Sequence, residues 1–432
     1  ITKTYGNIYT LWLGHTPLVV LNGCQTVREG LISTSEALSG RPLAAQYRFD
    51  KRKRGIAYSI GHTWKQQRRF GLMALRNMGL GKKGLESRIQ EEAQFLKNTL
   101  VAMNGKPTNL SDPITYCVAN IICAMVFGYR FSTDDPLFQK MVKGNHILID
   151  FFGSAWGRLY DAFPALMRYL PGPHQKSFEI AGFHDNFVVK EIRLHEQNGS
   201  QDDPQDIIGY YLAQIAKTKH EPDSTYDLAN MIQLVKDLFG AGTETTATTL
   251  QWALLYMVAY PDIQKKVQEE LDTVLQGSQL IYYEDRKRLP YTNAVIHEIY
   301  RYGNTSALGV PRCATKHFTL NGYTIKKDTM VVYNLDSVLR DPLYWETPDE
   351  FNPNHFLKEG SLSTNQAFLP FAAGHRVCLG EQMAQTELFI LFSTLLQVFS
   401  FQLPKGITEV NTTRIFSFAH KPNPFEICAI LR

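Results

Sequence analysis

The stretch that decides the fold is Phe371-Ala372-Ala373-Gly374-His375-Arg376-Val377-Cys378-Leu379-Gly380. It leads into residues 380–399, which are apolar almost all round after Glu387 and are therefore expected to form a deeply buried helix. A Cys378 thiolate at the N-terminus of that helix would be stabilised by backbone N–H groups and by the helix dipole. Gly374 permits backbone angles that other residues avoid, and Gly380 lets the backbone approach a flat ligand closely.

A single thiolate with no second cysteine nearby suits haem iron better than zinc, which prefers four ligands. Phe371 is expected to cover the sulfur and exclude water, and Arg376 offers a guanidinium fork to a carboxylate. The alternative is a structural cysteine buried in a tight turn, which is the better interpretation of a cysteine taken alone. The spacing of Phe371, Gly374 and Arg376 around Cys378 favours a haem site.

The composition of the whole chain excludes several other classes of protein. The 432 residues are 44% hydrophobic, which is ordinary for a globular protein and excludes disorder. The net charge of +4 is too small and too dispersed to indicate nucleic acid as a partner. Six scattered cysteines do not form a disulfide framework. The longest apolar runs, 116–129 and 388–401, are interrupted by polar residues and predict buried core helices rather than membrane spans.

The sequence pattern predicts a mainly α fold with small peripheral β-sheets. Helical periods dominate from Trp64 to about Leu275, and a long helix is expected over 227–259 with a new one starting at Pro261. The expected sheet segments are a hairpin over 8–21, a hairpin around Asn321-Gly322, a strand over 330–333 and a last hairpin that pairs 414–418 with 424–430. We expect residues 1–432 to form one catalytic domain, with no N-terminal membrane anchor in this chain.

Four motifs, in the same order, resemble those of the cytochrome P450 family, and the likeness covers essentially the whole chain. The cysteine stretch resembles its haem-binding signature; the other three are Trp64-x-x-x-Arg68, the oxygen-binding helix Ala241–Thr246 and Glu298-x-x-Arg301. The sequence is most similar to the vertebrate microsomal, family-2-like branch, which oxidises xenobiotics, fatty acids and arachidonate-like lipids. His355 stands where many members of the family have arginine.

The resemblance implies a haem held between the long central helix and the helix after the cysteine loop. Cys378 would be the axial ligand of the iron, and the residues implied to contact the cofactor are Trp64, Arg68, Arg376, Arg41, Arg312, Phe371, Gly374, Gly380, Ala241 and Gly242. Trp64 and the arginines would hold the propionates. Glu298 and Arg301, three apart on one helical face, would pair and form a structural network with His355.

Thr245 and Glu244 are the predicted catalytic residues. The Thr245 hydroxyl can bond back to the Ala241 carbonyl, which bends a helix and opens a groove. An acid and an alcohol at this position would deliver protons to bound O2. A solvent-facing polar patch is the alternative interpretation of the same residues.

The substrate site is expected to be lipophilic, because the positions that the resemblance assigns to it are aromatic or aliphatic. They are Ala57, Tyr58, Phe152, Phe239, Ala307, Val310, Phe416 and Phe418. Plain core packing is the alternative for each. Steroids are a further substrate class for such a pocket.

The sequence holds no flavin or nicotinamide motif, so electrons are expected to come from another protein. The resemblance implies that this partner is an NADPH-dependent reductase, with cytochrome b5 as a further partner. Basic residues at 51–54, Lys65, Arg69, Lys82 and Lys83 are candidates for a docking face toward an acidic redox partner. The apolar, turn-rich regions 163–164 and 169–173 are candidates for contact with a membrane surface, as in the microsomal members that the sequence resembles. The same resemblance implies a location at the endoplasmic reticulum membrane, with the catalytic domain facing the cytosol. Two rival functions stay open: a haem-thiolate isomerase or dehydratase of lipid peroxides that needs no reductase, and a non-enzymatic haem-binding protein.

Overall fold

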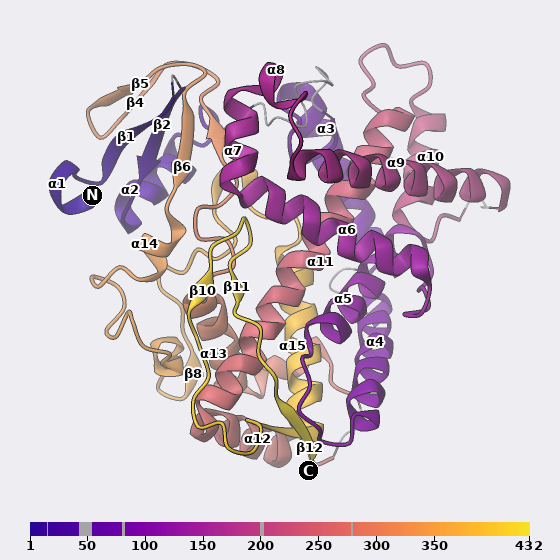
Figure 1. The fold of residues 1–432 in the computed structure, drawn as a ribbon, viewed down its shortest axis with the longest axis vertical. Coiled ribbons are helices and arrows are strands. Elements are labelled where there is room, and N and C mark those ends of the chain that lie inside the picture. Colours follow the sequence, from indigo (N-terminus) through magenta and orange to yellow (C-terminus); the bar gives the residue numbers. More distant parts are fainter. Residues whose placement is uncertain (15, 43–53, 80–82, 199–202, 278–279) are drawn as a thin grey trace.

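The computed structural model describes residues 1–432 except residues 15, 43–53, 80–82, 199–202 and 278–279. Helices make up most of the molecule and small sheets lie at its edges (Figure 1), so the predicted mainly α class is confirmed. The helices are α1 (Thr2–Tyr5), α2 (Cys24–Arg28), α3 (Gly61–Asn77), α4 (Lys83–Ala102), α5 (Ser111–Val126), α6 (Pro136–Gly153), α7 (Ala155–Ala162), α8 (Pro164–Met167), α9 (Pro173–Asn198), α10 (Ile207–Lys217), α11 (Leu228–Ala259), α12 (Pro261–Leu275), α13 (Pro290–Glu298), α14 (Leu335–Leu339) and α15 (Glu381–Val398).

Helix α11 runs through the middle of the molecule with α15 beside it (Figure 1). It begins where the Asp227 side chain accepts a hydrogen bond from the Asn230 N–H, and it ends two residues before Pro261. Its second half is buried on almost every side, as an interior helix requires. The helix predicted over 227–259 is therefore confirmed, and α4, α5 and α15 pack with α11 in one continuous apolar core.

The four-stranded sheet has the order β1-β2-β6-β3. Its strands are β1 (Ile8–Leu13), β2 (Thr16–Leu21), β6 (Met330–Tyr333) and β3 (Arg312–Cys313). Strands β1 and β2 form the predicted antiparallel hairpin, and β2 runs parallel to β6. The hairpin of β4 (Phe318–Leu320) and β5 (Tyr323–Ile325) turns at Asn321 and Gly322, which have φ angles of 49° and 81° as a tight hairpin turn demands.

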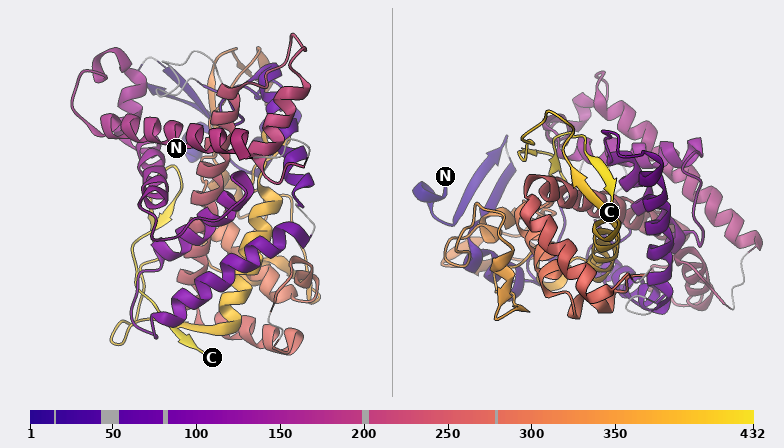
Figure 2. Two further views of the ribbon diagram at one scale, coloured as in Figure 1. Left: turned by 90° about the vertical axis from the view of Figure 1, so that its right-hand side faces the viewer. Right: turned by 90° about the horizontal axis from the view of Figure 1, so that it is seen from below.

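The prediction for the last hairpin was wrong in its pairing. Strand β10 (Arg414–Ile415) pairs with β11 (Lys421–Pro422), whereas β12 (Cys428–Leu431) pairs with β9 (Phe399–Gln402), the strand that follows α15. The reason is packing: Phe399 and Phe401 are buried on β9 and offer β12 an apolar edge. Figure 2 shows the C-terminal strand at one end of the helical body. The remaining two-residue strands are β7 (Leu357–Lys358) and β8 (Ser361–Leu362).

Most of each apolar run lies in α5 or α15, and most of these residues are buried. The end of the second run, 399–401, is not helical as predicted but belongs to strand β9. Within the described ranges, no helix has both the length and the apolarity to cross a bilayer.

Candidate active site

The cysteine loop is held in place by its backbone. A single helical turn, Gly374–Arg376, precedes Cys378, whose N–H donates to the Phe371 carbonyl at 3.1 Å. Gly374 has a φ of +74°, and a Cβ there would overlap the Leu31 carbonyl oxygen, so only glycine fits. Gly380 caps α15, and the position of its absent Cβ faces open space. The loop therefore leaves room beside the sulfur.

The Cys378 side chain is exposed, yet burial is the largest influence on its pKa, which it raises. Both observations hold for a sulfur that lies deep in the molecule and opens onto an internal space. The N–H groups of Gly380 and Glu381, at the start of α15, act in the opposite direction and lower the pKa. These donors favour a thiolate.

Helix α11 presents a second accessible surface in the interior of the fold. Ala241 and Thr245 are exposed, while Glu244 and Thr246 beside them are buried. The Thr245 hydroxyl donates to the Ala241 carbonyl at 2.8 Å, the bond predicted from the sequence. A Cβ on Gly242 would lie 2.6 Å from a methyl group of Ile122 on α5. The close contact that requires glycine at 242 is therefore with α5, and a cofactor contact there stays a prediction.

Four buried or half-buried arginines, Arg41, Arg68, Arg312 and Arg376, form what we call the arginine cluster. Each donates to backbone carbonyls: Arg68 to Val377 at 2.8 Å, Arg312 to Arg376 at 3.3 Å, and Arg376 to Ser39 at 2.9 Å. Arg376 also lies over the Trp64 ring, 4.2 Å from its centroid. The structure thus brings together the residues predicted to hold the propionates.

Three members of the arginine cluster, Arg68, Arg312 and Arg376, carry positive charge that no carboxylate of the described residues neutralises. None of their carboxylates forms an ion pair with Arg68, Arg312 or Arg376. Burial, followed by the charges of Arg41, Arg312 and Arg68, lowers the pKa of Arg376 to about 8. The Trp64 Nε1 and the Arg312 Nε are buried and have no hydrogen-bond partner among the described residues. Unused buried donors beside uncompensated cations are what a dianionic ligand would satisfy.

Glu244 does not lie with Thr245. Its carboxylate is 2.6 Å from His146 Nδ1 on α6 and 3.0 Å from the Lys421 ammonium on β11, and Lys421 also pairs with Asp150 at 3.0 Å. Burial alone would raise the pKa of Glu244, but His146 and Lys421 hold it below its usual value. Proton delivery by Glu244 stays a prediction, and it requires the side chain to leave these ion pairs.

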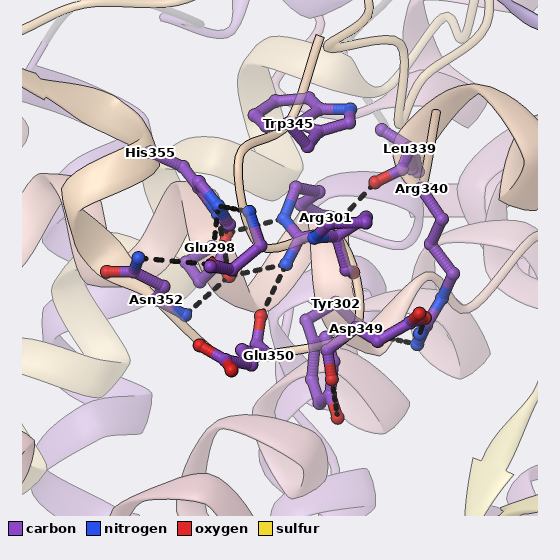
Figure 3. A network of polar contacts seen from close by, with 12 residues as sticks. Glu298, Arg301, Tyr302, Leu339, Arg340, Trp345, Asp349, Glu350, Asn352 and His355 are labelled. Carbon is purple, nitrogen blue, oxygen red and sulfur yellow. Dashed lines mark hydrogen bonds and ion pairs between the residues drawn. The ribbon is translucent and has the colours of Figure 1, made fainter. Parts of the chain in front are cut away.

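Glu298 and Arg301 are fully buried and form a bidentate pair with two hydrogen bonds of 2.7 Å (Figure 3). The Thr347 N–H donates to His355 Nε2, so Nε2 carries no proton and the proton is on Nδ1. Nδ1 lies 3.3 Å from the Glu298 carboxylate and donates to it. Arg301 also donates to the carbonyls of three residues in the following segments, namely Leu339, Pro348 and Glu350. The predicted triad is therefore assembled, and its role in holding the cysteine loop stays a prediction.

The predicted pocket residues fall into two groups. Ala57 and Val310 are drawn together because their carbonyls both accept from Arg41, at 2.9 Å each. Tyr58 is half-buried in the same loop as Ala57. Of the other five, Ala307 and Phe239 are buried, Phe152 packs on the apolar cluster under α7 and α8, Phe418 backs onto Gly153, and Phe416 is 85% exposed. Phe416 lies outside any enclosed wall in this structure.

Comparison with known proteins identifies the family. The model of the family "Cytochrome P450" matches residues 1–429. The chain belongs to the cytochrome P450 family. Among similar proteins, human cytochrome P450 2J2 is 45% identical over 404 residues, 94% of this chain and 80% of that protein. Mouse cytochrome P450 2J5 is 42% identical over 433 residues, 100% of this chain and 85% of that protein. Rat cytochrome P450 2C11 is 37% identical over 431 residues, 99% and 86% respectively.

Membership makes this P450 a haem-thiolate monooxygenase of lipophilic substrates that works with a redox partner. The residues present fit the cofactor, because the arginine cluster and the unpartnered Trp64 Nε1 match two propionates and the open space at Gly380 matches a flat ring.

Two residues of the site, His146 and Lys421, were not predicted from the sequence. They lie 98 and 177 positions from Glu244, and no local sequence pattern indicates that they contact it. Asp237, whose carboxylate accepts from the Ile56 and Ala57 N–H groups, was also not predicted; its signal was a lone acid in the apolar stretch before Ala241.

Proposed function

We propose that this P450 inserts one atom of O2 into xenobiotics, fatty acids or arachidonate-like lipids, with electrons from NADPH delivered by a reductase. The observation that carries the proposal is the set of groups around the cysteine loop: an accessible Cys378 sulfur at the start of α15 and unpartnered buried donors on Trp64 and Arg312. Bound haem with a thiolate ligand supplies O2 activation. Cys378 would hold the iron, and Trp64 with the arginine cluster would hold the propionates.

Thr245 acts on the other side of this site. Its hydroxyl donates to the Ala241 carbonyl, and the hydroxyl oxygen keeps lone pairs with which it can accept and pass on a proton. Glu244 is the proton source that we propose to lie behind Thr245, released from Lys421 and His146 when the side chain turns.

The partners and location follow the same proposal. Lys65 and Arg69 are exposed on α3 and would face an acidic reductase or cytochrome b5; the neighbouring candidates Lys51, Arg52, Lys53 and Lys82 lie outside the described residues. Apolar side chains stand exposed around α8, with Phe163 at 52%, Leu166 at 62% and Tyr169 at 78%. We propose that they contact the endoplasmic reticulum membrane, with the single catalytic domain on its cytosolic side.

The carbon monoxide difference spectrum of the reduced protein tests the ligand. Wild-type protein should show the strongly red-shifted Soret band of a thiolate-ligated haem, and Cys378→Ser should lose it. Cys313→Ser is the matched control, because Cys313 is a half-buried cysteine outside the cysteine loop, and it should keep the band. A red-shifted band in Cys378→Ser would refute the assignment.

Turnover distinguishes the reaction classes. A panel of lipids and drugs should yield oxygenated products, identified by mass spectrometry, only when NADPH and reductase are both present. Conversion of lipid hydroperoxides without reductase would instead indicate the isomerase or dehydratase class. A haem spectrum with no turnover of either kind would indicate a haem-binding protein.

A further inference from the structure

A cavity of about 250 Å³ lies between α4 and α5, two helices that pack side by side (Figure 1). Residues 92–99 of α4 form one side of it and residues 112–117 of α5 form another, while the segment 130–139 after α5 closes the third side. None of the residues that line this cavity belongs to the candidate active site. The cavity is therefore separate from the space around Cys378.

The walls that α4 and α5 contribute are largely apolar. Phe95 and Leu96 line the cavity from α4, and Pro113 and Tyr116 line it from α5. Leu96 is buried, whereas Phe95 is 43% exposed even though the Arg130 guanidinium lies 3.7 Å from its ring centroid. An apolar group that entered the cavity would remove exposed ring surface from water, which favours a ligand with a hydrophobic body.

Arg130, the single lysine or arginine among the described residues that line the cavity, already has a partner. Its Nε donates to Glu92 Oε1 at 2.6 Å, and its guanidinium stacks on Phe95. Glu92 is 3% exposed, and a carboxylate buried this deeply requires its cation. Arg130 therefore neutralises Glu92 and is not available to hold an anionic ligand.

The remaining charge of the cavity is negative. Asp112 and Asp134 both line it and are exposed, and within the described ranges no lysine, arginine or histidine forms an ion pair with either carboxylate. Three carboxylates against one guanidinium leave a net charge of −2. This charge repels an anion and attracts a cation.

Helix geometry explains only part of this arrangement. Asp112 lies in the first turn of α5, where a carboxylate stabilises the helix dipole, but that role does not extend to Asp134 or to the exposed ring of Phe95. The volume limits what the cavity can hold. Sites for drug-sized molecules enclose roughly 300–1,000 Å³, so a cavity of about 250 Å³ has room for one ring or a short chain.

We propose that this cavity is a second ligand site, which takes a small organic cation with an apolar body, such as an aryl or alkyl amine or an amidine. The apolar body lies against Phe95 and Tyr116, and the cationic group is balanced by Asp112 and Asp134. The inference is independent of the reaction proposed above, because no residue of the active site takes part in it.

Isothermal titration of the holoenzyme with benzamidine tests the proposal, with the haem iron saturated by 4-phenylimidazole so that the active site is filled. Benzamidine should bind to one site per chain with a Kd in the millimolar range or below. Neutral benzamide, which has the same shape, should bind at least about fivefold more weakly, because it gains no attraction from exposed carboxylates. Benzoate, an anion of similar size, should not bind.

Charge variants locate the site. Asp112→Asn and Asp134→Asn should each weaken benzamidine binding about two- to fivefold, and the double variant should weaken it about tenfold. Glu91→Gln is the matched control, because Glu91 is an exposed acid on α4 that does not line the cavity, and it should bind as wild type does. If the charge variants do not fold, Thr99→Trp decides, since it fills the cavity from an exposed position of α4 and should abolish binding.

Four results would overturn the proposal. They are the absence of saturable benzamidine binding at millimolar concentration, binding that occurs only without 4-phenylimidazole, equal affinities for benzamidine and benzamide, and an affinity that neither the double variant nor Thr99→Trp changes. Hydrogen–deuterium exchange gives an independent readout, because benzamidine should slow exchange in the peptide covering residues 92–99 of wild type and leave it unchanged in Thr99→Trp.

Discussion

Replacing Trp64 with phenylalanine distinguishes the contribution of this side chain to protein stability from its contribution to cofactor binding. The indole ring is 7% exposed and packs under the Arg376 guanidinium, while its Nε1 has no partner among the described residues. Phenylalanine keeps most of the ring and removes the unused N–H. Without cofactor the substitution breaks no hydrogen bond, whereas with cofactor it removes one bond to a charged propionate, worth about 1.5–3 kcal/mol. Haem should therefore dissociate about 10 to 150 times faster.

The assay is transfer of haem from the holoenzyme to excess apomyoglobin, followed through the Soret band. Trp345→Phe is the matched control: Trp345 is 1% exposed, and its Nε1 donates to the Val338 carbonyl at 3.1 Å. That substitution removes one of the two hydrogen bonds to the Val338 carbonyl, which keeps the one from the Asp341 N–H at 3.3 Å. It should therefore lower the free energy of unfolding by about 0.5–1.5 kcal/mol and leave haem transfer unchanged. Equal transfer rates for wild type and Trp64→Phe would refute the role of this donor.

Three further predictions concern the buried charges and the α11 hydroxyl. Glu298→Gln leaves the buried Arg301 guanidinium uncompensated and should lower the free energy of unfolding, measured by urea titration, by about 3–5 kcal/mol. A loss of free energy smaller than that from breaking an exposed ion pair would contradict the network. Lys421→Met should lower stability at pH 7 by about 1–3 kcal/mol, since Glu244 keeps its charge with one partner fewer. Because the fold lowers the pKa of Glu244, the stabilisation by the Lys421 ion pair is present above the pKa of an unfolded glutamate, about 4.3, and disappears as the pH falls through the folded pKa. A stability difference between wild type and Lys421→Met that persists in acid would refute the assignment. Thr245→Ala should raise peroxide release per NADPH consumed at unchanged haem content, and unchanged coupling would count against the hydroxyl as a proton carrier.

Much of this fold was predictable because its signals are local. Asn321-Gly322 specifies a tight turn, Asp227 and Pro261 bound α11, and Gly374 marks a backbone angle that other residues avoid. The pairing of β12 with β9 was not predictable in this way, because it depends on the buried phenylalanines of a strand nearly thirty residues away.

The motifs predicted which residues make up the site, but they did not predict the directions in which the side chains point. Neighbours on a helix point about 100° apart, so Glu244 and Thr245 leave α11 in different directions. Thr245 faces the accessible interior, and Glu244 is bound by Lys421 and His146 from segments that no motif connects to it. A sequence motif fixes which residues are adjacent; tertiary contacts decide which of them reach the reacting atoms.

The arginine cluster connects the cofactor site with the loop at the substrate site. Arg376 is buried beside other guanidiniums, and since an arginine stays protonated in proteins, the lowering of its pKa to about 8 expresses how unfavourable its charge is at this place. Nothing among the described carboxylates removes that cost, and the same guanidinium holds loop Gly55–Ser59. A dianionic cofactor would relieve the repulsion and strengthen the hold on the loop in a single binding event. Cofactor binding and the shape of the substrate wall are therefore expected to be energetically linked in this P450.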